Sequence, residues 1–315
     1  MRDADRRTLV RALAGCVLAL MLGPVAAAPA LALGVVYPDV PEPYRALFLR
    51  IVEGIEDANG GGVQTLAVSD DTDPQALAAW ASRRRLDAVI ALGRQGMEAA
   101  RTLQGALPVV VGAVSLRPGP AEGVTGVSLV PEPGAVFARL RRIAPGVRRV
   151  HVVYSVEESG WLVARAKEAA PAMGLSLHAE AVADAREGTR RLLEMTRGLR
   201  GAEEAVWLLR DRRAVAEQVV LAELVRRAWE QGFVLFSSSP AHAGRGALFA
   251  AYPDSLGLGR RLARLAAEAA AGRGPAGIRP LEALALAVNL RTARHMGIEL
   301  GEEILGAAEV VFPQR

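Results

Sequence analysis

The strongest constraint on this chain is a repeated alternation of short Val- and Ile-rich runs with longer amphipathic stretches, which starts at Leu33. Apolar runs of this length are typical of buried strands, and apolar residues at helical spacing are typical of helices packed on a sheet. The first series predicts strands at 33–38, 63–68, 87–93 and 107–114. The helices expected between them are 42–61, 74–85 and 95–104. Successive strand–helix units predict a parallel sheet with right-handed crossovers.

A second series of the same kind follows the segment "RPGPAEG" at 117–123, whose Pro and Gly residues indicate a linker. A strand at 124–130 leads into it. Its expected strands are 148–155, 175–182, 204–210 and 232–238. Its expected helices are 157–172, 186–199 and 213–230. A strand at 246–252, an Ala-rich helix at 255–271 and a tail complete the chain. The fold class expected is α/β, with two doubly wound parallel-sheet lobes joined by a hinge of several crossings.

The expected lobe boundaries follow from these two series. Lobe 1 comprises 33–116 and 247–275, and lobe 2 comprises 124–245 and 280–315. The hinge crossings are expected near 117–123, 239–246 and 272–280. Ligands of open α/β sheets bind beyond the carboxyl ends of the strands, so a cleft between two such lobes is the expected binding site.

Residues 1–32 predict a signal peptide, because a charged start precedes an apolar run from Ala12 and small residues that end at Ala32. Cleavage is expected after Ala32, which places the protein in the periplasm. An uncleaved membrane anchor is the alternative. The Arg6-Arg7 pair fits either a twin-arginine signal or an ordinary charged start. "LAGC" resembles a lipobox, but the apolar run lies mostly after Cys16, which favours a coincidence over lipid anchoring.

Charge argues against a nucleic-acid partner. The formal net charge is +4, and residues 1–32 hold four Arg and two Asp. Half of the positive excess therefore lies in the expected leader, and the rest of the chain is close to neutral. No basic block with interleaved aromatic residues occurs. The leader also stands where the DNA-binding headpiece of a two-lobed repressor would lie.

The motifs of cofactor and metal chemistry are missing from the sequence. "GLGRRL" at 257–262 approaches a dinucleotide fingerprint, but Leu262 stands where Gly or Ala is needed. The histidines are far apart, without a paired spacing or a neighbouring Cys, so no metal site is expected. They are His151, His178, His242 and His295. No nucleophile has a recognisable base, so we expect no catalytic residue, no cofactor and no enzyme activity.

Four segments resemble the periplasmic ABC-transporter substrate-binding proteins, the family that includes binders of aromatic amino acids. The most specific is the tail "LEALALAVNLRTARHMGIELGEEILGAAEVVF" at 281–312. The others are "EGVTGVSL" at 122–129, "PGVRRVHVVYS" at 145–155 and "GALFAAYPDSLGLGRRLA" at 246–263. The resemblance implies a type I periplasmic binding protein fold and capture of a small molecule by hinge closure. It also implies a monomer that partners an ABC permease or a sensor protein.

The tail itself is expected to be structural. Asn289 has the side chain of a helix N-cap for the stretch "LRTARHMG", and Gly297 is placed to end that helix.

Candidate ligand contacts are the polar residues that follow the expected strands. In lobe 1 they are Tyr37, Asp39, Gly93, Arg94, Gln95 and Ser115. In lobe 2 they are Tyr154, Ser155, Arg210, Asp211, Ser237 and Ser238, with Tyr252 at the return crossing. The loop that holds Gly93 opens a helix whose free N–H groups suit an anion, and Arg94 adds a bidentate donor. Asp39 or Asp211 suits an ammonium group. The alternative is that these residues do not contact a ligand: the charged side chains are solvated and the serines only cap a helix.

Where the chain departs from the family, it does so at these loops. It has "YPDVPEP" at 37–43, "YSVEES" at 154–159 and "AYPD" at 251–254, where amino-acid binders carry other sequences. The family's ligand is therefore not carried over, and the ligand expected is amino-acid-like or anionic. Delivery to an importer is the favoured role. Ligand sensing with a receptor is the alternative, and a periplasmic enzyme on the same fold is a third.

Overall fold

The computed structural model describes residues 30–119, 123–274 and 276–313. The expected signal peptide, with its twin-arginine and lipobox alternatives, falls almost entirely on residues 1–29 and therefore lies outside the described residues. In the described part of the chain, no helix combines the length and the apolar character that crossing a bilayer requires.

The first sheet is wholly parallel and contains most of the first predicted series. Its strands are β1 (Leu33–Pro38), β2 (Gln64–Val68), β3 (Ala88–Leu92), β4 (Val109–Val114), β5 (Thr125–Pro131) and β11 (Gly277–Leu281). Their order is β11-β5-β4-β3-β1-β2. The helices of this part are α2 (Tyr44–Asn59), α3 (Pro74–Arg83), α4 (Gly93–Ala100), the 3-10 turn η1 (Arg101–Leu103) and α10 (Ser255–Ala270).

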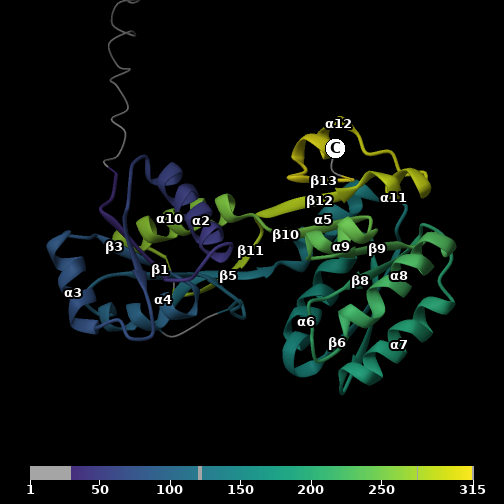
Figure 1. Cartoon of the computed structure of the whole chain (residues 1–315), viewed down its shortest axis with the longest axis horizontal. Helices are drawn as coiled ribbons and strands as arrows, with labels where there is room; N and C mark the ends of the chain where they lie inside the picture. The colour runs from purple at the N-terminus through teal and green to yellow at the C-terminus, as the bar shows by residue number, and fades with distance from the viewer. Residues whose placement is uncertain (1–29, 120–122, 275, 314–315) are drawn as a thin grey trace, which may run out of the picture. The chain divides into compact units, whose positions relative to one another are not determined.

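Helices α2 and α10 pack closely on one another, and two glycines permit the contact. A Cβ on Gly259 of α10 would lie 2.1 Å from the carbonyl oxygen of Ile51. A Cβ on Gly54 of α2 would lie 2.2 Å from the carbonyl oxygen of Leu256. Segments about 200 residues apart in sequence are thereby joined, and α10 is fixed to the first sheet (Figure 1).

The second sheet is parallel except for one pair. Its strands are β6 (Arg149–Ser155), β7 (Ser176–Val182), β8 (Glu204–Leu208), β9 (Val234–Ser237), β10 (Phe249–Pro253), β12 (Leu284–Asn289) and β13 (Val310–Phe312). Their order is β13-β12-β10-β9-β8-β6-β7, and only β10 and β12 are antiparallel. The helices are α5 (Pro133–Ile143), α6 (Val156–Ala172), α7 (Ala185–Arg197), α8 (Glu217–Gln231), α9 (Pro240–Arg245), α11 (Leu290–His295) and α12 (Glu302–Ala307).

Two strands lie in the sheet opposite to the one expected, which corrects the lobe boundaries. Strand β5, expected in lobe 2, pairs with β4 and β11 in the first sheet. Strand β10, expected in lobe 1, pairs with β9 and β12 in the second sheet. The segment 117–123 therefore links two strands of the first sheet, 239–246 holds α9 of the second sheet, and the end of 272–280 lies in β11 of the first sheet. The physical reason is that each strand pairs in parallel with the strand before it, β5 with β4 and β10 with β9, so the chain crosses to the other sheet after these strands and not before them.

The chain passes between the sheets at three places: after β5, after β10 and after β11. Backbone hydrogen bonds tie these crossings together. The N–H of Glu132 donates to the carbonyl of Leu281 at 2.9 Å, and the N–H of Asp254 donates to the carbonyl of Ala283 at 3.1 Å. Arg165 of α6 also pairs with Glu132 at 2.9 Å. The three crossings thus form one connected unit.

Aromatic rings dominate the core of the second sheet. Trp207 of β8 and Phe236 of β9 stack with ring centroids 6.2 Å apart, and Phe236 stacks on Phe249 of β10 at 5.2 Å. Phe137 of α5 meets the Trp207 ring edge-on at 5.4 Å. All four side chains are almost fully buried. This cluster holds the strands whose carboxyl ends carry the cavity described below.

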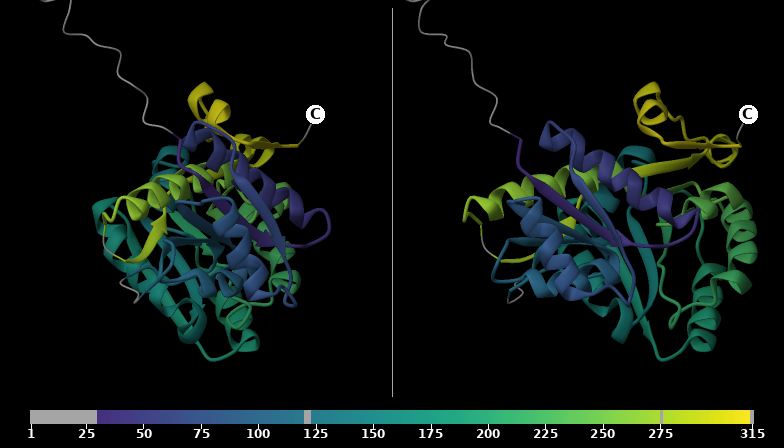
Figure 2. Two further views of the ribbon diagram at one scale, coloured as in Figure 1. Left: turned by 90° about the vertical axis from the view of Figure 1, so that its left-hand side faces the viewer. Right: turned by 60° about the vertical axis from the view of Figure 1, so that its left-hand side comes forward.

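The tail confirms the expected helix cap. The Asn289 side chain accepts a hydrogen bond from the N–H of Thr292 at 2.9 Å, and Gly297 follows α11 in a left-handed conformation with φ of 66°. The amide of Asn289 also donates to the carbonyl of Ala243 at 2.7 Å. The elements β12, α11, α12 and β13, drawn in yellow, lie next to one another in Figures 1 and 2.

We expect the N289A variant to lower the free energy of unfolding by about 2–3 kcal/mol. The variant removes an N-cap and leaves a buried carbonyl of Ala243 without its donor. Urea denaturation followed by circular dichroism measures the change. A loss below about 0.5 kcal/mol would show that the cap contributes little.

Candidate functional site

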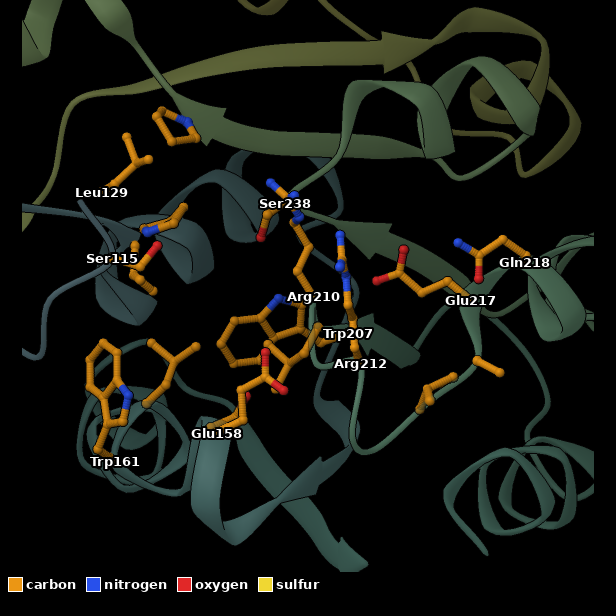
Figure 3. A pocket seen from close by; sticks show the side chains of 18 residues that line it. Ser115, Leu129, Glu158, Trp161, Trp207, Arg210, Arg212, Glu217, Gln218 and Ser238 are labelled. Carbon is orange, nitrogen blue, oxygen red and sulfur yellow. The ribbon is translucent and has the colours of Figure 1, made fainter. Parts of the chain in front are cut away.

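A cavity of about 1050 Å³ lies beyond the carboxyl ends of β6, β8 and β9. Most of its wall comes from loops and helix starts of the second sheet, and the ends of β4 and β5 complete it. The residues that line it are Ser115, Leu129, Val130, Pro131, Glu158, Ser159, Trp161, Leu162, Trp207, Leu209, Arg210, Arg212, Val215, Ala216, Glu217, Gln218, Ser238 and Pro253. Figure 3 shows the labelled side chains around this space.

Three of the residues predicted from strand ends line this cavity. Ser115 follows β4, Arg210 follows β8 and Ser238 follows β9. Together they span more than 100 residues of the chain, from Ser115 to Ser238. Arg210 and Ser238 converge because the carboxyl ends of parallel strands share one edge of the second sheet, whereas Ser115 reaches the cavity from the first sheet.

Ser155 and Asp211 form a buried network next to residues of the cavity wall, since Arg210 and Arg212 on either side of Asp211 line the cavity. Asp211 is fully buried, and its carboxylate accepts hydrogen bonds from the N–H of Ser155 at 2.8 Å and from the Ser155 hydroxyl at 3.1 Å. The N–H of Ala214 donates to the same carboxylate at 2.9 Å. Asp211 therefore joins the end of β6, where α6 begins, to the loop after β8, and its oxygens are occupied by protein donors.

Ser237 belongs to a second buried network, which reaches the cavity through Glu217. The hydroxyl of Ser237 lies 3.1 Å from Nδ1 of His242, and Nε2 of His242 lies 3.4 Å from a carboxylate oxygen of Glu217. A Ser–His–carboxylate series is also found in hydrolases. Here Ser237 is fully buried, and its hydroxyl accepts from the N–H of Ser239 at 3.1 Å. The network thus positions Glu217 at the cavity wall and does not present a nucleophile.

The other predicted contacts of the first lobe lie away from this cavity. Tyr37 stacks on Phe48 at 6.4 Å, and Asp39 pairs with Arg45 at 3.2 Å on the surface. Gly93, Arg94 and Gln95 form the first turn of α4. There the Gln95 amide donates to Asp70 at 2.8 Å, beside a smaller cavity of about 270 Å³. These residues stay predictions as ligand contacts.

Tyr154 and Tyr252 also stay predictions. Tyr154 is half-buried near the end of β6. The hydroxyl of Tyr252 donates to Glu309 at 3.2 Å. Burial first, and then the negative charge of Glu309, raise the pKa of this hydroxyl.

Reasoning from strand ends missed five prominent residues of the wall. They are Glu158, Trp161, Trp207, Arg212 and Glu217. Glu158 and Trp161 lie in the first two turns of α6, and Glu217 opens α8. A search extended to the first two turns of each following helix would have included these three. Trp207 lies inside a strand, where the sequence pattern indicates only core.

The cavity wall combines positively and negatively charged side chains with Trp rings. Arg210 and Arg212 supply guanidinium donors, and Glu158 and Glu217 supply carboxylates. Burial first, and then the negative charge of Asp211, raise the pKa of Glu158. Within the described residues, no group of His, Cys, Asp and Glu is arranged to hold a metal ion. The arrangement suits a small molecule that offers acceptors to the arginines and donors to the carboxylates.

Comparisons with known proteins agree with the fold. A family model described as ABC transporter substrate binding protein matches residues 64–312. No curated protein sequence gives a match.

Two solved structures illustrate the likeness. One is the ABC domain from Streptococcus pneumoniae in complex with L-Trp, at 20% identity and a TM-score of 0.50, covering 90% of this chain and 99% of that one. The other is the ligand-free, open structure of CD0873 from Clostridium difficile, a substrate-binding protein with adhesive properties. It has 16% identity and a TM-score of 0.61, and covers 90% of this chain and all of that one.

Proposed function

Because this chain belongs to the ABC transporter substrate-binding protein family and has the type I periplasmic binding protein fold, we propose that it captures a small solute for an ABC importer. Proteins of this family generally bind solutes without transforming them, and they are generally exported to the periplasm. In this proposal the chain is exported by residues 1–32 and binds its ligand in the cavity at the carboxyl ends of β6, β8 and β9. A permease in the inner membrane then binds the ligand-bound form of the protein and receives the solute from it.

The observation that carries the proposal is the composition of the cavity wall. Its volume of about 1050 Å³ is suited to a small molecule, and its lining combines Trp rings with two Arg and two Glu side chains. Hydrogen bonds to charged groups of this kind are stronger than those between neutral groups. A ligand with an anionic end and a donor end, such as an amino-acid-like molecule, satisfies both signs of charge. The relative from Streptococcus pneumoniae in complex with L-Trp makes amino acids the first class to test.

Hinge closure is the proposed mechanism of capture. The three crossings after β5, β10 and β11 are hydrogen-bonded to one another, so they can bend as one unit. Residues from both sheets line the cavity, since Ser115 and Pro131 come from the first sheet and Arg210 from the loop after β8 of the second. A ligand that contacts both parts stabilises the conformation in which they approach each other.

The test of the proposal is a thermal-shift screen of the purified full-length chain, followed by calorimetry. The panel is L-tryptophan, L-glutamate, succinate, glucose, adenine and spermidine. A ligand at about 100 times its dissociation constant stabilises the folded state by about 2.7 kcal/mol, which raises the melting temperature measurably. A protein with no response to any of these compounds at millimolar concentration contradicts the proposal for these ligand classes. Conversion of a panel member would indicate an enzyme, and binding without uptake by the cognate permease would favour a sensor.

We expect the R210A and R212A variants each to weaken binding of an anionic panel member by about 10- to 100-fold. Each removes a charge-assisted donor from the cavity wall. Calorimetric titration measures the affinities. The matched control is R213A, because Arg213 pairs with Glu157 and is not part of the cavity lining. Equal losses in R212A and R213A would point to a general effect of charge and not to a contact.

A further inference from the structure

Trp207 presents a donor that the described protein does not use. The side chain is 2% exposed, and its Nε1 has no hydrogen-bond partner among the residues that the structure describes. Its ring nevertheless forms part of the cavity wall. In Figure 3 the nitrogen lies on the edge of the indole that faces Ser238 and Arg210.

An unused indole N–H is costly at this depth. Indole nitrogen is a donor only, and a buried donor without an acceptor costs about 1–3 kcal/mol. Buried Trp side chains usually find a partner for this reason. Two rings, those of Phe137 and Phe236, pack on Trp207. They offer only carbon contacts, which a phenylalanine at position 207 would also make. The stability of the protein alone therefore gives no reason for a nitrogen at this position.

The position of Trp207 suits a ligand donor. It belongs to β8, an interior strand of the second sheet between β9 and β6, and is held by aromatic packing against Phe137 and Phe236. A donor held by packing loses little conformational entropy when it binds. Arg210 follows β8 in the same wall, so an acceptor placed before the indole also lies near a positive charge.

We infer that Trp207 is a specificity-determining ligand contact, whose indole N–H donates a hydrogen bond to an oxygen acceptor of the captured molecule. The inference rests on the proposed function and deepens it. The captured molecule presents a carboxylate or another oxygen acceptor at the inner end of the cavity. A molecule with only cationic and apolar groups leaves the N–H unsatisfied and gains nothing from it, so it is bound more weakly than one with an acceptor at this position.

The test compares W207F with the wild type in calorimetric titrations of the full-length chain. Phenylalanine keeps ring packing and removes only the donor and part of the ring. The probes are L-tryptophan, L-glutamate and succinate, which carry a carboxylate, and spermidine, which does not. We expect W207F to weaken binding of the carboxylate probes by about 10-fold or more and to leave spermidine unaffected. The control is W229F, because Trp229 stacks on His295 outside the cavity.

A second measurement follows ligand binding in the wild type and uses the variant only to assign one signal. In a spectrum of indole N–H groups labelled with nitrogen-15, the Trp207 signal is expected to move downfield when a binding carboxylate probe is added. The signal is assigned by its loss in W207F.

The outcomes separate the inference from the proposed function. Wild-type binding that W207F leaves unchanged, or that does not move the Trp207 signal, overturns the inference and leaves solute capture intact. Binding of no probe by the wild type removes the proposed function for these ligands, and the inference with it. Weakened binding of spermidine by W207F, equal to that of succinate, also overturns the inference, because the loss is then not specific to acceptors.

Discussion

The D211A variant is expected to lose about 3–5 kcal/mol of the free energy of unfolding and to lose ligand binding. The Asp211 carboxylate is fully buried and accepts three hydrogen bonds, two from Ser155 and one from the N–H of Ala214. Removing it leaves buried donors without an acceptor, and each of these costs about 1–3 kcal/mol, with incomplete additivity. The start of α6 and the loop after β8 are also released from each other, and both contribute to the cavity wall.

The matched control for this variant is D184A. Asp184 also accepts two backbone hydrogen bonds at a helix start, from Arg186 and Glu187, but it is exposed to solvent. Its loss is expected to cost about 1 kcal/mol, as for an ordinary N-cap. Urea denaturation of both variants measures the difference. A loss in D211A no larger than that in D184A would show that the buried network does not hold the start of α6 to the loop after β8.

The helix–strand alternation was enough to predict the fold class but not the membership of every strand. The strand expected at 87–93 corresponds to β3, and the repetition of such units led to the two parallel sheets. The sequence prediction places strands β5 and β10 in the wrong sheet, because the apolar pattern of each indicates a strand but not the sheet to which it belongs. Each pairs with the strand before it, β5 with β4 and β10 with β9, and the chain crosses to the other sheet only afterwards. The Pro- and Gly-rich segment at 117–123 indicates a break in the local pattern, but it does not show on which side of β5 the crossing lies.

The candidate site was predicted only where the backbone topology alone determines it. Arg210 and Ser238 line the cavity because the carboxyl ends of β8 and β9 share one edge of the second sheet, and Ser115 lies at the carboxyl end of β4 in the first sheet. Asp211 and Ser237 were singled out by the same rule, but their carboxylate and hydroxyl groups bond other protein atoms. The direction of a side chain, toward the cavity or toward a neighbouring loop, depends on packing. The rule cannot resolve two adjacent residues such as Arg210 and Asp211.

The G188A variant is expected to lose about 2–4 kcal/mol of the free energy of unfolding and to bind ligand more weakly. Gly188 lies in α7, and a Cβ there would lie 1.8 Å from the carbonyl oxygen of Ala214 and 3.0 Å from a methyl group of Val182. A backbone carbonyl cannot rotate away from a new methyl group as a flexible side chain can. Either α7 or the loop that holds Ala214 must therefore move. The loop continues directly into Val215, which lines the cavity.

The control for G188A is the same substitution in a helix that has room for it. A Cβ on Gly160 of α6 would lie 3.5 Å from a methyl group of Val156, an ordinary contact. Because Ala favours helix more than Gly, G160A is expected to gain up to about 1 kcal/mol. Urea denaturation and calorimetry on the two variants separate the close approach at Ala214 from the change in helix propensity. If G188A were as stable as the wild type and bound ligand equally well, the loop after β8 would have to move away from the new methyl group without a loss of stability. The Asp211 network would then be too weak to hold Ala214 in place, and the predictions for D211A and G188A would both be wrong.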